Sequence, residues 1–169
     1  MEKLTGLNKL KTAVFISGNG SNFKNLLKFS KIKEAPISIN LVISNVNKAK
    51  GLKYADQINV KKKIFNFKDI EAEKKILTLL KKEKINFICL AGFMKILSKN
   101  FIKKFDGKII NIHPSLLPKY KGLNTHYKAI ANKDKFTGCT VHYVTEKLDS
   151  GKIIMQKKIK ITARDNVVS

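Results

Sequence analysis

The chain has 169 residues, of which 43% are hydrophobic, and a formal net charge of +23 at pH 7. A chain of this length most simply forms one domain, and its hydrophobic fraction supports a packed core, which excludes a disordered protein. No apolar run approaches the roughly 20 residues that cross a bilayer, and residues 1–11 are too polar for a secretory signal. We therefore expect one cytoplasmic domain, residues 1–169, with residues 1–11 as an N-terminal extension.

The positive charge first suggests a nucleic-acid partner, but its make-up argues against one. Of the 35 basic residues, 34 are lysines scattered along the chain and only Arg164 is an arginine. Proteins that read nucleic acids rely on arginine for bidentate contacts. The chain also has 21 Ile and 15 Asn. Heavy use of Lys, Ile and Asn together indicates a genome-wide drift in amino-acid composition rather than selection for a basic binding surface. We expect no specific nucleic-acid partner, although the positive field favours phosphorylated ligands and folates that carry glutamates.

Strand and helix patterns alternate along the chain, which predicts an α/β protein with a mostly parallel sheet flanked by helices. In chain order, the patterns predict a strand at 12–16, a helix at 22–31, a strand at 37–43, a helix at 51–58 and a strand at 64–67. Asp69 is expected to cap the next helix, whose apolar side would carry Ile70, Ile76, Leu77 and Leu80. There follow a strand at 87–90, a helix at 98–105, a strand at 108–112, a helix at 126–131, and long strands at 137–145 and 152–161.

Cys89 and Cys139 both lie in apolar, strand-like segments. Such cysteines are typically buried free thiols rather than a disulfide or metal pair. Neither Cys-x-x-Cys nor His-Glu-x-x-His spacing occurs, so the sequence predicts no metal site.

A glycine-rich turn, Gly18-Asn-Gly20, follows the first predicted strand and leads into a helix near Asn22. Glycines let the backbone approach a phosphate, and a helix N-terminus supplies free N–H groups and partial positive charge. The turn lacks the Lys-Ser/Thr pair of ATP-binding loops and the third glycine of dinucleotide-binding turns. It is therefore either a plain turn or a phosphate site, and ATP and NAD are poor candidates.

The segment from Asn111 to Pro118 (NIHPSLLP), with Asp149 downstream, carries groups suited to acyl transfer without a metal. Asn111 and His113 lie on one side of a strand, at its C-terminal end, where ligands bind in open α/β sheets. The amide can hydrogen-bond a developing oxyanion, the imidazole can carry a proton, and the carboxylate can hold the imidazole charged. The alternative is a structural histidine and an aspartate that merely shapes a turn.

Four segments resemble the glycinamide ribonucleotide formyltransferase family, in the same order: 16–22 (ISGNGSN), 90–94 (LAGFM), 111–126 (NIHPSLLPKYKGLNTH) and 141–149 (VHYVTEKLD). The resemblance runs from about Thr12 to the C-terminus, and residues 122–126 favour the purine-pathway branch over the methionyl-tRNA branch. It implies a Rossmann-like formyltransferase fold. The implied reaction moves the formyl group of the cosubstrate 10-formyltetrahydrofolate to the amine of 5-phosphoribosylglycinamide in de novo purine biosynthesis, without a metal. The implied assembly is a monomer or homodimer.

The resemblance also assigns roles to individual residues. Asn111, His113 and Asp149 would be catalytic, and Gly20, Ser21 and Asn22 would hold the ribonucleotide phosphate. The folate would contact Phe93, Met94, Lys95, Ile96, Leu97, Asn111, Val144, Thr145, Glu146, Lys147, Leu148 and Asp149. Glu146 would not be the catalytic acid, and the Leu117-Pro118 bond would be cis. His142 is expected to be structural, while for His126 a structural and a binding role stay equally open.

Three features depart from the family pattern. The basic residue that reaches the folate tail aligns near Ile70, with Lys68 as a candidate substitute, and Lys95 stands where the family usually has Arg. The family continues beyond Ser169 through a helical region that carries a Glu near the substrate amine. We therefore expect a shortened enzyme that binds folate but turns over poorly.

Three alternatives remain. Methionyl-tRNA formyltransferase would need a C-terminal RNA-binding domain, and formyltetrahydrofolate deformylase would need an N-terminal regulatory domain. A lysine-rich nucleic-acid-binding module is the alternative outside enzymes.

Overall fold

A computed structural model describes residues 9–167 of the protein. The chain forms two compact units, one ending at Ile109 and the other beginning at Ile110. No helix within residues 9–167 is long and apolar enough to cross a membrane.

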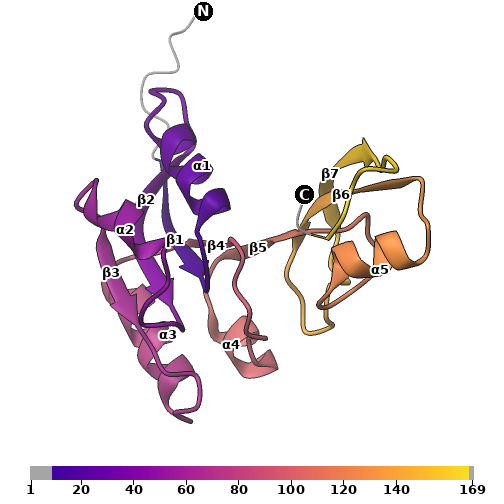
Figure 1. The fold of residues 1–169 in the computed structure, drawn as a ribbon. Coiled ribbons are helices and arrows are strands. Elements are labelled where there is room, and N and C mark those ends of the chain that lie inside the picture. The colour runs from indigo at the N-terminus through magenta and orange to yellow at the C-terminus, as the bar shows by residue number, and fades with distance from the viewer. Residues whose placement is uncertain (1–8, 168–169) are drawn as a thin grey trace, which may run out of the picture. The chain divides into compact units, whose positions relative to one another are not determined.

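Within residues 9–109, four strands form a parallel sheet in the order β3-β2-β1-β4. The strands are β1 (Leu10–Ile16), β2 (Ile37–Ser44), β3 (Lys61–Ile64) and β4 (Phe87–Leu90). The helices are α1 (Ser21–Ser30), α2 (Leu52–Asp56), α3 (Ala72–Lys82) and α4 (Lys99–Lys104), and Figure 1 shows α1, α2 and α3 beside the strands. The chain proceeds from β1 outward to β2 and β3, then returns to the other side of β1 with β4. The carboxyl ends of β1 and β4 therefore form the switch point at which such sheets bind ligands.

The core of this unit follows from its continuous apolar strands. The four apolar residues that end β1, Ala13 to Ile16, are fully buried, as are Leu41 to Ile43 on β2. Strands of a parallel sheet are covered on both faces, which explains why they lack polar alternation. Helix α1 buries Phe23 and Leu27, spaced four residues apart on one side of the helix.

Within residues 110–167, the second unit is an antiparallel arrangement with one helix. Strand β6 (Phe136–Tyr143) pairs with β5 (Lys108–His113) on one side and with β7 (Ile153–Lys160) on the other. Helix α5 (Thr125–Ala131) lies between β5 and β6 in the chain. Every residue of β7 is exposed, whereas β6 buries Thr140 and His142.

Most predicted elements are confirmed to within a few residues at their ends, but the strand predicted at 64–67 is wrong. The strand is β3, and it occupies Lys61–Ile64, with all four residues exposed. It lies at the edge of the sheet, where lysines discourage pairing with another chain. Hydrophobic patterning in the sequence therefore could not predict where β3 lies.

The predicted start of the following helix is also wrong. Helix α3 begins at Ala72, and Asp69 does not cap it. Its Oδ1 instead accepts a hydrogen bond from the Glu71 N–H at 3.0 Å, which closes a turn ahead of the helix. Ile70 precedes the helix and is 94% exposed, so it does not belong to the buried side, which is formed by Ala72, Ile76 and Leu80.

The two cysteines differ in burial. Cys89 on β4 is a buried free thiol, as predicted, and burial raises its pKa to about 12. Cys139 on β6 is also free but only half-buried, so its predicted burial is wrong. Strand β7 beside it is exposed throughout, which leaves β6 less covered than the sequence implied.

Candidate active site

Strand pairing in the second unit places three polar side chains together. Asn111 on β5 lies opposite His142 on β6, and His113 lies opposite Thr140. Residues directly opposite one another, and those two positions along, project from the same face of an antiparallel pair. His113 and His142 are 4% and 2% exposed, so this face is buried. Asn111, His113 and His142 thus form one polar cluster.

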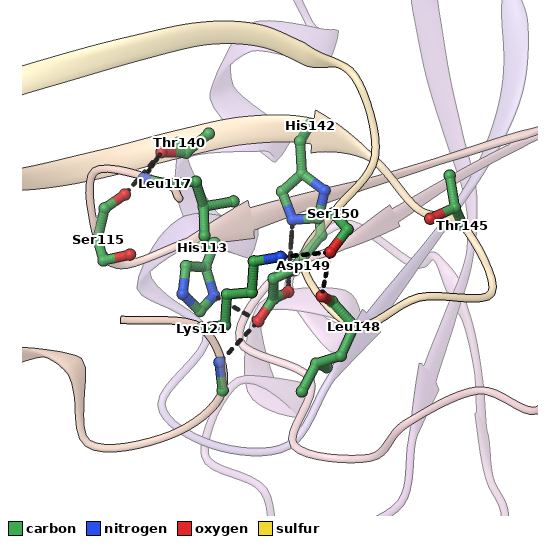
Figure 2. Close-up of polar contacts among 12 residues, drawn as sticks. His113, Ser115, Leu117, Lys121, Thr140, His142, Thr145, Leu148, Asp149 and Ser150 are labelled. Atoms are coloured by element: carbon green, nitrogen blue, oxygen red, sulfur yellow. Dashed lines mark hydrogen bonds and ion pairs between the residues drawn. The ribbon is translucent and has the colours of Figure 1, made fainter. Parts of the chain in front are cut away.

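Asp149 reaches the cluster from the loop between β6 and β7. Its Oδ2 lies 3.4 Å from His113 Nδ1, and its Oδ1 lies 3.5 Å from His142 Nε2. Figure 2 shows the carboxylate between the two rings. The backbone of Asp149 has a φ of 43°, a left-handed conformation that aspartate tolerates better than most residues. The loop therefore directs this side chain inward, where it is 7% exposed.

Several donors surround the Asp149 carboxylate. The Gly122 N–H donates to Oδ2 at 2.8 Å, and Asn111 Nδ2 lies 3.5 Å from Oδ1 and 3.3 Å from His142 Nε2. Burial raises the pKa of Asp149, but the His142 hydrogen bond, the Gly122 amide and the charge of His113 together outweigh it. The pKa of this carboxyl therefore lies below its usual value, and the group is ionised at neutral pH.

The two histidine rings are each held at both nitrogens. His113 Nε2 donates to the Tyr120 carbonyl at 2.9 Å, so its Nδ1 faces Asp149. His142 Nδ1 donates to the Tyr143 carbonyl at 2.9 Å, so its Nε2 faces Asn111 and Asp149. His113 therefore has an oxygen acceptor facing each of its ring nitrogens.

The turn after His113 is anchored to β6. Thr140 Oγ1 donates to the Ser115 carbonyl at 2.6 Å and accepts from the Leu117 N–H at 3.1 Å (Figure 2). The Leu117-Pro118 bond is cis, as expected from the family resemblance. Lys121 Nζ donates to Ser150 Oγ, which joins this segment to the loop that carries Asp149.

In the first unit, the glycine turn has the geometry of an anion site. Gly20 has a φ of 75° and precedes α1, so Ser21 and Asn22 occupy the first helical turn, where N–H groups lack partners within the helix. The Gly51 N–H donates to the Gly18 carbonyl at 2.9 Å. A Cβ on Gly20 would lie 2.5 Å from the Gly51 Cα, so only glycine fits there.

The residues expected to bind folate differ in exposure. The Phe93 ring packs edge-on against Phe15 and Phe67, with centroids 5.3 and 5.2 Å away, and Leu97 is 5% exposed. The Leu97 side chain is therefore buried in the first unit, whereas the Phe93 ring is half-buried. By contrast, Met94 and Ile96 are 63% and 76% exposed. The others expected to bind folate are half-buried or exposed: Lys95, Val144, Thr145, Glu146, Lys147 and Leu148.

The cluster contains one residue that sequence reasoning missed. His142, for which the sequence predicts a structural role, contacts both Asn111 and Asp149. The signal lies in the strand register that pairs it with Asn111, which the sequence does not display. His126 is exposed on the first turn of α5, outside the cluster. Among residues 9–167, no group of three or more His, Cys, Asp or Glu is arranged to hold a metal ion.

Comparisons with known proteins agree on one family. The model of the formyl transferase family matches residues 10–169. The chain is 42% identical to phosphoribosylglycinamide formyltransferase of Haemophilus influenzae over 161 residues, which are 93% of this chain and 76% of that protein. It is 39% identical to the human trifunctional purine biosynthetic protein adenosine-3 over 95% of this chain, but spans only 16% of that protein.

Solved structures show the same fold. The crystal structure of phosphoribosylglycinamide formyltransferase from Anaplasma phagocytophilum matches with a TM-score of 0.89 and 40% identity, over 95% of this chain and 77% of that one. The corresponding enzyme from Brucella melitensis matches with a TM-score of 0.89 and 38% identity, over 95% of this chain and 85% of that one. The predicted α/β fold with a mostly parallel sheet flanked by helices is confirmed.

Proposed function

Because the chain belongs to the formyl transferase family, we propose that it transfers the formyl group of 10-formyltetrahydrofolate to the primary amine of 5-phosphoribosylglycinamide. Relatives named for this activity match most of the chain, which supports the choice of substrates. The observation that carries the proposal is the ionised Asp149 carboxylate, held between His113 and His142 beside the Asn111 amide. Such a cluster can stabilise an oxyanion and move a proton at the same centre.

The chemistry follows from the groups in this cluster. The substrate amine attacks the formyl carbon, and a tetrahedral oxyanion forms. The Asn111 amide and a protonated His113 stabilise that oxyanion, the amide through a hydrogen bond and the imidazolium through its charge, while the Asp149 carboxylate lies 3.4 Å from the His113 ring. A proton passes from the attacking nitrogen through water, with Asp149 as relay, to N10 of the folate as the C–N10 bond breaks. The products are the formylated ribonucleotide and tetrahydrofolate.

The two substrates would use the remaining predicted residues. Gly20, Ser21 and Asn22 supply the N–H groups of a helix N-terminus, which suits the ribonucleotide phosphate. The exposed segment around Met94 and residues 144–148 would contact the folate, largely through backbone groups, since Phe93 and Leu97 pack inward. The positive net charge would favour both anionic substrates.

The test is an assay in which 10-formylfolate loses its formyl group only when 5-phosphoribosylglycinamide is present. We expect strict dependence on the ribonucleotide for the wild-type chain and for an Asp165→Asn control, whose carboxylate accepts hydrogen bonds from the backbone N–H and the hydroxyl of Thr162 in its own turn. Loss of the formyl group without the ribonucleotide would instead identify a deformylase. No reaction under either condition would reject the proposal.

A further inference from the structure

Ser17 follows β1 directly, and its hydroxyl is used both as acceptor and as donor. The Met94 N–H donates to Ser17 Oγ at 2.7 Å, and Ser17 Oγ donates to Asn45 Oδ1 at 2.5 Å. In addition, the Ser17 N–H donates to the Gly92 carbonyl at 3.1 Å. Residues separated by 77 positions in the chain are thus joined through one side chain.

These contacts lie at the switch point of the parallel sheet. Ser17 comes after β1, Asn45 after β2, and Gly92 to Met94 after β4. Ser17 is also the residue before the glycine turn, whose Gly18 carbonyl accepts from the Gly51 N–H. The glycine turn and the segment from Gly92 to Met94, called here the Met94 segment, are therefore joined by hydrogen bonds at the position where parallel sheets bind ligands.

The Met94 segment has few other anchors for its backbone. Gly92 has a φ of 74°, and a Cβ added to it would meet no atom within 4 Å, so no neighbouring group packs against that side of the glycine. The Phe93 ring is held by Phe15 and Phe67, but the Met94 side chain is 63% exposed. The Ser17 hydroxyl therefore fixes the Met94 backbone at a point where the Met94 side chain is largely exposed.

We propose that Ser17, supported by Asn45, is a positioning residue that keeps the Met94 segment in the shape that receives the folate. The inference rests on the proposed function, since it assigns the folate to this segment. Without the hydroxyl, both the Met94 N–H and Asn45 Oδ1 lose a partner, and the segment can move about Gly92. The folate would then bind less tightly, while the glycine turn keeps its contact with Gly51 and continues to receive the ribonucleotide.

The experiment compares Ser17→Ala with the wild-type full chain. Titration with 10-formylfolate alone should show about tenfold weaker binding, the scale of one partly buried hydrogen bond and its unsatisfied partner. Affinity for 5-phosphoribosylglycinamide should change less than about twofold, and kcat at saturating folate should be preserved. Hydrogen exchange of the Met94 amide, followed by NMR, should accelerate, since that amide loses its acceptor.

Four further variants separate positioning from general stability. Ser17→Thr keeps the hydroxyl and should restore folate affinity, and Asn45→Asp keeps the acceptor and should behave similarly. Asn45→Ala should reproduce a weaker form of the Ser17→Ala defect and replaces it if Ser17→Ala does not fold. Ser30→Ala is the matched control, because Ser30 Oγ donates a local hydrogen bond to the Leu27 carbonyl at the end of α1.

Two outcomes would overturn the inference alone. One is equal folate affinity for Ser17→Ala and wild type, and the other is an equal loss for both ligands accompanied by a lower melting temperature. A wild-type chain that does not bind 10-formylfolate would instead reject the proposed function itself.

Discussion

Asp149 contacts one histidine through each of its carboxylate oxygens. Oδ2 faces His113 and the Gly122 amide, while Oδ1 faces His142 and Asn111. Since both rings are also held by backbone carbonyls, their orientation does not depend on a bound substrate. A preorganised group of this kind spends little free energy on rearrangement when charge develops in the transition state.

Replacing His113 by Ala or Asp149 by Asn should each lower turnover by at least about a hundredfold, the scale of general acid–base catalysis. Both variants should still bind the ribonucleotide, because its phosphate is expected at the glycine turn. Steady-state kinetics and ribonucleotide titration measure the two effects. Near-normal turnover in either variant would contradict the mechanism.

Replacing Asp149 by Asn should also change how stability depends on pH. The folded-state pKa of Asp149 lies below its ordinary value, so its ionised form contributes stability above about pH 4. That contribution is lost as the pH falls through the folded-state pKa. The variant lacks it, so its free energy of unfolding should decline less steeply than that of the wild type below about pH 4.

Urea unfolding at a series of pH values between neutrality and about 2.5 measures this difference. Asp165→Asn provides the control for removing one carboxylate elsewhere in the same unit. Parallel curves for Asp149→Asn and the wild type would mean that the surroundings of Asp149 do not favour its charged form.

At the scale of elements, the turn between β1 and α1 shows which glycine the fold requires. Gly20→Ala places a Cβ 2.5 Å from the Gly51 Cα at a φ of 75°, and backbone cannot yield as a side chain can. We expect a loss of about 1–3 kcal/mol in the free energy of unfolding. Gly18→Ala is the matched control, since a Cβ there meets nothing within 4 Å. Equal stability of the two variants, measured by thermal or urea unfolding, would contradict this account.

The same turn should distinguish between the two ligands. Asn22→Ala, in the first turn of α1, should weaken 5-phosphoribosylglycinamide binding more than 10-formylfolate binding, because the phosphate is expected at this helix end. Separate titrations of each ligand decide the matter. If both affinities fell equally, the turn would be a structural feature only.

At the scale of the whole molecule, the net charge of +23 arises almost entirely from lysines, many of them exposed. Lysines attract phosphates without reading bases. Any RNA or DNA binding should therefore be weak, insensitive to sequence and steeply reduced by salt, as filter-binding or fluorescence anisotropy titrations can measure. A sequence-specific complex that survives about 0.15 M salt, where exposed charges are strongly screened, would revive the nucleic-acid alternative.

The elements that the sequence predicted well are those with a strong local signal. Phe87–Leu90 is a continuous apolar run and forms β4 with the predicted bounds, and Ser98 caps α4 by accepting from the Phe101 N–H. The bounds of strand β3 were predicted wrongly because its three lysines give no apolar pattern. The roles predicted for Asp69 as a helix cap and for Ile70 on the apolar side of the helix were wrong, because a turn closed by the Asp69 side chain precedes α3.

The candidate cluster also has features that the sequence predicts and features that only the structure shows. The residues Asn111, His113 and Asp149 could be named from the sequence, because short segments around them resemble a known family and their side chains suit acyl transfer. The contact between Asp149 and the two rings, and the membership of His142, were decided only by the tertiary structure. Asn111 and His142 are 31 residues apart, and Asn111 and Asp149 are 38 apart. Local sequence determines which segments become strands, but the pairing register between distant strands depends on the packing of the whole fold, and a shift of one residue would turn His142 to the other face.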